Sequence, residues 1–170
     1  MGVILFDLSR AALGGGTTVE NNVNAGVVVA AQSLFRAGPS KIKNNGAGCL
    51  PGNICGGLIA IRNSTVRLNG TEVSGNTGNG IELEQGIDLG INNSTIANNS
   101  GIGVNILRIS IGDFILGNTF SGNGGGAIAC DDTSLITGDV SAVAKKDISC
   151  KQIDRLNGAA RPGKVKEPKP

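Results

Sequence analysis

A segment of about 23 residues repeats along this chain and restricts its possible folds more than any other feature. Each unit opens on a glycine, and the last four of these glycines are evenly spaced. Self-similarity at a fixed period indicates stacked units, each of which buries its apolar face only against its neighbours. We identify six units in the 170 residues, opening at Gly2, Gly26, Gly57, Gly80, Gly103 and Gly126.

Within each unit the apolar residues recur two positions apart, which is the period of a β-strand. With the opening glycine counted as zero, apolar pairs stand at positions one and three and at nine and eleven, and a single apolar residue follows near sixteen or seventeen. In the last unit this frame places Ala127 and Ala129 inward and Cys130 outward. Glycine, asparagine and serine fill the intervals, as turns require. The sequence therefore predicts three short strands per unit.

Three strands and three turns describe one rung of a coil, and the many glycines disfavour helices. Rungs stacked at the strand spacing of about 4.8 Å would align each inward side chain with its equivalent in the next rung. The prediction is an all-β fold, a parallel β-helix of about six rungs over residues 2–150. Asparagines near position nineteen or twenty are expected to stack as a ladder that bonds the backbone of one turn; they are Asn22, Asn45, Asn76, Asn99 and Asn123.

The recurring strings GNTGNGIEL, NNSGIGVNI and GNGGGAIAC resemble the repeats of right-handed parallel β-helix proteins of the pectin-lyase-like superfamily. The resemblance covers residues 2–150 and implies a right-handed coil. It is specific for the fold and not for a function, because that superfamily includes pectate lyases, polygalacturonases, uronan epimerases, phage tailspikes and surface proteins without known activity.

Two segments depart from the repeat. Residues 49–56 are eight extra residues between the second and third rungs, and we expect them to bulge out as a loop. Residues 151–170 are polar and are predicted to form a tail or linker. Because Gly2 already opens a rung, we expect further N-terminal rungs in a longer protein; the alternatives are that this end stacks on a partner chain or that the tail folds over it.

Several outward positions of the first three rungs carry apolar residues. Such a patch is typical of a contact surface, so we predict a subunit interface or a contact with missing rungs. The alternative is that the loop at 49–56 or the tail covers it. The residues of this predicted interface are Ile4, Phe6, Val28, Ile59 and Ile61.

The four cysteines fall into two pairs. Cys49 and Cys55 close a short loop, which favours a disulfide over free thiols. Cys130 and Cys150 are expected on opposite sides of the coil wall one rung apart, so their pairing stays open. An even count with two plausible pairs favours an oxidising compartment, and we predict a secreted or cell-surface protein.

Composition excludes several classes of function. The chain has no histidine, which removes imidazole bases and histidine-ligated metals, and no metal site is predicted. Its net charge is +2 and it has no tryptophan or tyrosine to stack on bases, so nucleic acid is not an expected partner. No apolar run approaches the roughly 18 residues of a membrane span.

One charged cluster is the candidate catalytic site. Arg62 and Arg108 share position five in their units, and Glu84 stands on the rung between them. Lyases of the superfamily resemble one another in using calcium-binding carboxylates with an arginine base, so these three residues would be catalytic in a lyase, which would also need calcium; otherwise no cofactor is expected. The alternative is a solvated charged face. Candidate binding residues beside them are Glu82, Gln85 and Asp131.

These observations favour a non-catalytic β-helix module of a secreted or surface protein that binds glycan or another protein chain. Two alternatives remain. One is a polysaccharide-active enzyme, namely a uronan lyase or epimerase or a C-terminal fragment of one. The other is a self-assembling structural module that forms a homo-oligomer through its open end and apolar patch.

Overall fold

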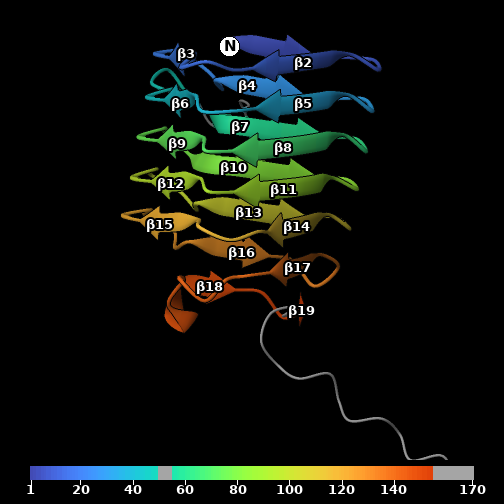
Figure 1. Cartoon of the computed structure of the whole chain (residues 1–170), viewed down its shortest axis with the longest axis vertical. Coiled ribbons are helices and arrows are strands. Elements are labelled where there is room, and N and C mark those ends of the chain that lie inside the picture. Colours follow the sequence, from blue (N-terminus) through green and yellow to red (C-terminus); the bar gives the residue numbers. More distant parts are fainter. Residues whose placement is uncertain (50–54, 155–170) are drawn as a thin grey trace, which may run out of the picture.

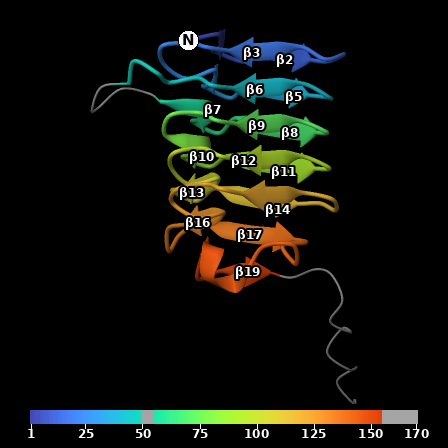
Figure 2. The same ribbon diagram turned by 90° about the vertical axis from the view of Figure 1, so that its left-hand side faces the viewer.

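The computed structural model describes residues 1–49 and 55–154, and it shows a β-solenoid (Figure 1). The chain winds through about six turns, and each of the first five passes through three parallel sheets (Figures 1 and 2). The predicted all-β parallel coil is thereby confirmed. Within the described ranges no helix is long and apolar enough to cross a membrane.

Every strand pairing in the three sheets is parallel, and neighbours in a sheet come from successive turns. Sheet A contains β1 (Val3–Leu5), β4 (Val27–Val29), β7 (Gly56–Ile61), β10 (Asn79–Glu84), β13 (Val104–Leu107), β16 (Ile128–Cys130) and β18 (Ile148–Ser149). Sheet B contains β2 (Arg10–Leu13), β5 (Leu34–Ala37), β8 (Thr65–Asn69), β11 (Asp88–Asn92), β14 (Ile111–Phe114), β17 (Leu135–Gly138) and β19 (Ile153–Asp154). Sheet C contains β3 (Thr18–Glu20), β6 (Lys41–Lys43), β9 (Glu72–Ser74), β12 (Thr95–Ala97) and β15 (Thr119–Ser121).

The register of sheet A shows where the turns change length. Ile81 pairs with Leu58 on one side and with Val104 on the other, and each of these steps equals one sequence repeat. Val27 pairs with Leu58, which is a longer step, so the extra residues before the third turn leave the strands aligned. Residues 50–54 of this insertion lie outside the described residues, as does most of the predicted tail.

In the sixth turn the repeat is shifted by one residue from the predicted frame. Ile128 pairs with Val104 and Cys130 pairs with Ile106, so these two take the inward strand positions expected for Ala127 and Ala129. Ala127 is still buried, at the corner position that Gly103 occupies one turn earlier. The cause of the shift is one extra residue at 115–118, in the bend between β14 and β15. Phe114 pairs with Ile91 and keeps the repeat, whereas Phe120 pairs with Ile96 and stands one position later than the repeat requires.

Strand pairing also continues past the end of the repeat. A short 3₁₀ helix, η1 (Lys145–Asp147), leads into β18, and β19 then pairs with β17. The coil therefore extends to residue 154, beyond the predicted limit at residue 150.

The core is a column of aliphatic side chains inside the three sheets. Fully buried side chains from every sheet contribute to one cluster, including Phe35, Ile42, Leu58, Leu83, Ile96 and Phe114. The first five opening glycines, from Gly2 to Gly103, stand where the wall has no room for a side chain, whereas the nearest atom to a Cβ on Gly126 would be 3.4 Å away. A Cβ on Gly80 would lie 2.7 Å from both the carbonyl oxygen of Gly103 and the Nδ2 of Asn99. The glycine repeat is therefore a packing requirement of the corner between sheets C and A.

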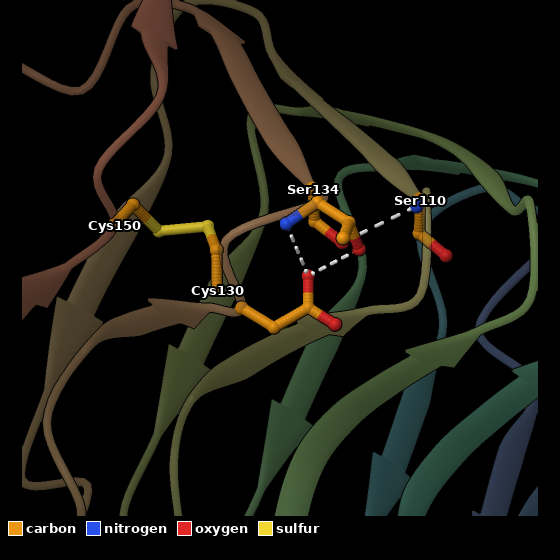
Figure 3. Close-up of a disulfide and its surroundings, with 6 residues drawn as sticks. Ser110, Cys130, Ser134 and Cys150 are labelled. Atoms are coloured by element: carbon orange, nitrogen blue, oxygen red, sulfur yellow. Dashed lines mark hydrogen bonds between the residues drawn. A yellow bond between two sulfur atoms is a disulfide. The ribbon is translucent and has the colours of Figure 1, made fainter.

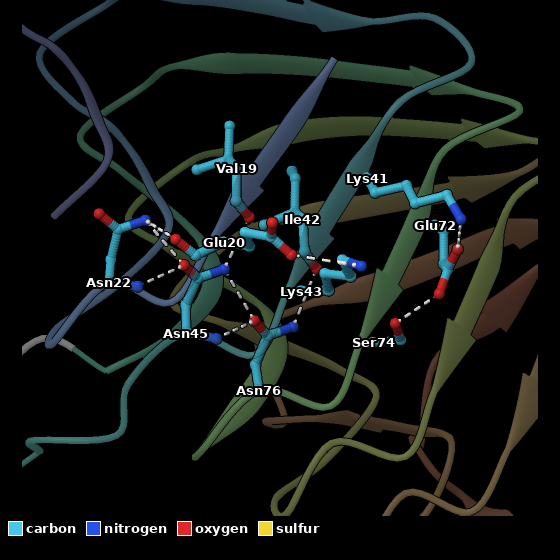
Figure 4. Close-up of polar contacts among 10 residues, drawn as sticks. All are labelled: Val19, Glu20, Asn22, Lys41, Ile42, Lys43, Asn45, Glu72, Ser74 and Asn76. Atoms are coloured by element: carbon cyan, nitrogen blue, oxygen red, sulfur yellow. Dashed lines mark hydrogen bonds and ion pairs between the residues drawn. The ribbon is translucent and has the colours of Figure 1, made fainter. Parts of the chain in front are cut away.

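The predicted asparagine ladder occupies that corner (Figure 4). The Nδ2 of Asn45 donates to the Oδ1 of Asn76 at 3.0 Å and to the carbonyl of Val19 at 3.1 Å. The backbone N–H of Asn45 donates to the same Oδ1 at 3.0 Å. The left-handed conformation is adopted by the residue before each ladder position, for example Asn44 with φ 53°, and not by the ladder asparagine.

Polar ladders also stand at the other two corners, and the sequence reasoning missed them. At the corner between sheets A and B, the N–H of Ser33 donates to Ser64 Oγ at 3.2 Å. At the corner between sheets B and C, the N–H of Thr71 donates to Ser94 Oγ at 3.1 Å. Each hydroxyl satisfies a bend N–H of the preceding turn, which a closed coil wall would otherwise leave unbonded.

Both cysteine pairs form disulfides in the structure. The Cα atoms of Cys49 and Cys55 are 5.9 Å apart. Those of Cys130 and Cys150 are 4.7 Å apart, which is the separation of neighbouring strands, and this bond lies beside the Ser110 and Ser134 corner (Figure 3). Cys130 was expected to face outward; it packs against the core because of the shifted register, and it meets Cys150 there.

Only part of the predicted apolar interface is exposed in the structure. Ile4 and Phe6 are 58% and 50% exposed. Val28 and Ile59 were expected to face solvent, but they are only 5% and 6% exposed. They lie opposite each other on β4 and β7 and pack with Ala25 as a second apolar cluster, with Ile61 beside it. These two residues therefore do not belong to an open surface.

Candidate functional site

The predicted charged cluster lies at the bends between sheets A and B. Arg62 follows β7, Gln85 follows β10 and Arg108 follows β13, and all three adopt the left-handed conformation with φ of 57°, 66° and 56°. They line a shallow depression on successive turns, together with Asn63, Gly86 and Ile109. We call Arg62, Glu84, Gln85 and Arg108 the bend cluster.

Within the bend cluster, Arg108 forms an ion pair with Glu84. The Nη1 of Arg108 lies 3.1 Å from the Oε2 of Glu84, and the two side chains are 61% and 26% exposed. Arg62 contacts Glu84 through the backbone, its N–H donating to the Glu84 carbonyl at 3.2 Å. An ion pair this exposed contributes at most about 1 kcal/mol to stability, so it is an ordinary surface contact between turns.

Asp131 accepts a backbone hydrogen bond from the bend of the neighbouring turn. Its Oδ2 accepts the N–H of Arg108 at 2.6 Å, and its Oδ1 accepts the N–H of Thr133 at 3.0 Å and the Thr133 hydroxyl at 2.8 Å. The bond from the Arg108 N–H is the main cause that lowers the pKa of Asp131 from 3.8 to about 2, and bonds from Ser134 and Thr133 add to it. This carboxylate is a structural acceptor rather than a proton-transfer group.

Glu82 also has a local partner. It projects from β10, and its Oε2 accepts a hydrogen bond from the Nδ2 of Asn79 at 2.6 Å. The Oδ1 of Asn79 in turn accepts the N–H of Ile102 on the next turn at 2.8 Å. The structure thus places Glu82 in a chain of contacts that runs along sheet A, away from the sheet A–B bends.

The carboxylates near the bend cluster do not fit a calcium site. Calcium takes six to eight oxygen ligands, usually including several carboxylates. Across residues 1–49 and 55–154, no three acidic or cysteine side chains come together as a possible metal site. Glu84 is bound by Arg108 and Glu82 by Asn79. The described carboxylates around the bend cluster therefore do not supply the ligand set of a calcium site.

A second depression lies on the outer face of sheet B, and the sequence reasoning did not single it out. It is lined by arginines from β2, β5 and β8 together with polar and aliphatic neighbours. One signal in the sequence points to it, since Arg36 and Arg67 each stand ten residues after the opening glycine of their units. We call this depression the arginine groove; its lining residues are Leu8, Arg10, Gln32, Ser33, Leu34, Arg36, Thr65 and Arg67.

Fold and surface together define a parallel β-solenoid with two charged depressions on its outer wall. No protein-family model, curated protein or solved structure matches the chain.

Proposed function

We propose that this chain is a non-catalytic module of the pectin-lyase-like type, which belongs to a secreted or surface protein and binds glycan on its outer wall. The observation that carries the proposal is the state of the bend cluster and its neighbours. Arg108 is paired with Glu84, and Asp131 accepts three hydrogen bonds from the bends. A general base must be free to reach the proton that it abstracts, and Arg108, Glu84 and Asp131 each have a bonded partner in the wall.

Geometry supports a binding role for the same wall. Parallel strands about 4.8 Å apart present outward side chains as regular rows along the coil axis. Every pairing from β2 to β17 in sheet B is in continuous register, so these rows extend over six turns. A linear polymer with a repeating unit suits such a surface because successive units meet equivalent positions.

The proposed secreted or surface location is supported by the two disulfides. Cys49–Cys55 and Cys130–Cys150 account for all four cysteines of the chain. Disulfides persist in oxidising compartments and are rare in a reducing cytosol. Quantifying free thiols in the protein purified from its native source tests this part of the proposal: we expect none, and four free thiols would contradict it.

The functional test is a panel of neutral and acidic polysaccharides, with calcium present, read in two channels. One channel measures binding and the other measures the ultraviolet absorbance of unsaturated uronate products. We expect binding without product. Product formation that is lost in Arg108→Ala, and retained in the matched control Lys41→Ala, would overturn the proposal. Lys41 is a suitable control because it too is an exposed cation paired with a glutamate, Glu72, at 3.2 Å.

A second candidate function is self-association, and one observation favours it. Ile4 and Phe6 are half exposed or more, and β1 forms the edge of sheet A in the described part of the chain. Exposed strand edges pair readily with other chains. If this surface associates, the mass in solution exceeds that of the monomer and Ile4→Lys lowers it; a monomeric mass for both proteins would exclude the second candidate.

A further inference from the structure

The arginine groove places like charges side by side. β2, β5 and β8 are neighbours in sheet B (Figure 1). Arg36 lies directly opposite Arg67 in the register, and Arg10 lies opposite Leu34. Like charges directly opposite each other on adjacent strands are destabilising. Arg36 therefore adds positive charge directly beside Arg67, and an anion bound at this face would compensate it.

Only one of these arginines is neutralised within the described ranges. Arg67 pairs with Asp88 on β11, and its Nη1 also donates to the carbonyls of Asp88 at 2.9 Å and Val66 at 3.0 Å. Gly90 leaves room for this arrangement, because a Cβ there would lie 2.9 Å from the Arg67 Cδ. The guanidinium of Arg67 is thus fixed in place along the sheet.

Arg10 and Arg36 have no acidic partner among the described residues, and both side chains are exposed. They share the groove with the polar residues Gln32 and Thr65. Leu8, which is 71% exposed, adds apolar surface at the same depression. The groove thus combines uncompensated positive charge, hydrogen-bonding groups and an apolar surface.

We infer that the arginine groove binds an acidic glycan, one whose sugars carry carboxylate or sulfate groups. This inference rests on the proposed function and adds the face and the ligand class. Guanidinium groups bind such oxyanions through two parallel hydrogen bonds. The apolar surface at Leu8 suits the C–H face of a sugar ring. No aromatic side chain lines the groove, so it lacks the stacking surface that single-stranded nucleic acid uses.

The charge pattern also limits the extent of the site. Beyond β8 the outer face of sheet B carries Asp88 on β11 and Asp113 on β14. Asp113 repels an acidic chain and Asp88 neutralises Arg67, so the uncompensated positive charge and its ligand are confined to the first three turns. The same face would therefore hold a short acidic segment of a glycan chain across its first three turns, although the rows themselves continue along the coil.

Titration calorimetry of the full chain tests the inference with four ligands: an oligogalacturonate, its methyl-esterified neutral form, a sulfated oligosaccharide and a single-stranded oligonucleotide. We expect the carboxylated or the sulfated ligand to bind, or both, and the neutral form to bind more weakly. Arg36→Gln should weaken binding by about ten- to a hundredfold, since a hydrogen bond to a charged group is lost. Arg36→Lys should restore binding only in part, because lysine keeps the charge without the bidentate geometry.

The matched control carries the same change in net charge elsewhere. Arg10→Gln with Arg36→Gln is compared with Lys41→Gln with Lys43→Gln, which lie on β6 in sheet C. All four positions are on the outer wall, and an unchanged melting temperature verifies that each variant is folded. We expect the arginine pair to abolish binding and the lysine pair to leave it within about twofold.

The outcomes distinguish a failure of the acidic-glycan inference from a failure of the proposed function. If the neutral and acidic glycans bind equally and the arginine variants change nothing, the inference is wrong while the proposed function stands. If no glycan binds, both are wrong. If the oligonucleotide alone binds, and does so through Arg10 and Arg36, the groove is a phosphate-polymer site and the acidic-glycan inference is overturned.

Discussion

The side-chain amide of Asn76 donates a hydrogen bond to the side-chain oxygen of Asn99, one turn further along the coil, at 2.9 Å. Asn99 repeats the same contact with Asn123 at 2.9 Å. Asn76 and Asn99 are each only 1% exposed. Every interior member of the ladder thus receives a side-chain bond from one neighbour and gives one to the next.

Replacing Asn76 with alanine should destabilise the coil by about 2–3 kcal/mol, because buried donors and acceptors would be left unbonded. The groups that lose their partner are the N–H and Nδ2 of Asn45 and the carbonyl of Ile42. Urea unfolding measures the loss. Asn22→Ala is the control, since Asn22 ends the ladder and is only half-buried, and its loss should be below about 1 kcal/mol. Equal losses would show that the ladder contributes little.

Replacing Gly80 with alanine should cost about 1–3 kcal/mol, because the added methyl group meets the backbone of the next turn. Thermal or urea unfolding gives the size of the effect. Gly14→Ala is the matched control, since a Cβ at Gly14 has no atom within 4 Å. A neutral Gly80→Ala would mean that the corner between sheets C and A is looser than the contacts indicate.

Removing the Cys130–Cys150 disulfide should lower the free energy of unfolding by about 3 kcal/mol, because the bond closes a 20-residue segment of the unfolded chain. The double variant Cys130→Ala with Cys150→Ala, measured without reductant, tests this value. Cys49→Ala with Cys55→Ala is the comparison, and its effect should be smaller because the two residues are only six apart. A larger loss for the shorter loop would contradict this ranking.

Acid should weaken the coil partly through Asp131. The pKa of this carboxyl is about 2 in the folded chain, below its usual 3.8, so its contribution to stability is present above pH 3.8 and is lost as pH falls through about 2. Asp131→Asn should therefore reduce the fall in stability between these pH values. Urea unfolding at pH 7, 4 and 2 measures it, with Asp132→Asn as the control. Parallel curves for the wild type and Asp131→Asn would exclude this role.

Periodicity predicted the coil well because packing inside a solenoid acts on the same positions in every turn. The column of opening glycines and the ladder from Asn22 to Asn123 are visible in the sequence for that reason. The frame of the sixth turn was missed because Ala127, Ile128 and Ala129 are all apolar. Their pattern alone does not fix which of them faces inward, and the extra residue that decides it lies in an earlier bend.

The charged sites were less predictable because they depend on contacts between turns. The sequence placed Arg62, Glu84 and Arg108 on neighbouring turns, and the structure brings them to one edge. That Asp131 accepts the Arg108 N–H depends on the local bend geometry, which no residue pattern encodes. The arginine groove joins side chains from β2, β5 and β8, and the shared position of Arg36 and Arg67 in their units is the one part of it that the sequence indicates.

The most direct test of a non-catalytic glycan-binding coil is one calorimetric titration of the purified chain with an acidic polysaccharide in the presence of calcium. Binding without turnover predicts heats that decay to the baseline as sites fill. Sustained heat flow after each injection would reveal turnover and contradict the account. The absence of any heat, together with unchanged migration of the protein in a gel that contains the polysaccharide, would contradict binding itself.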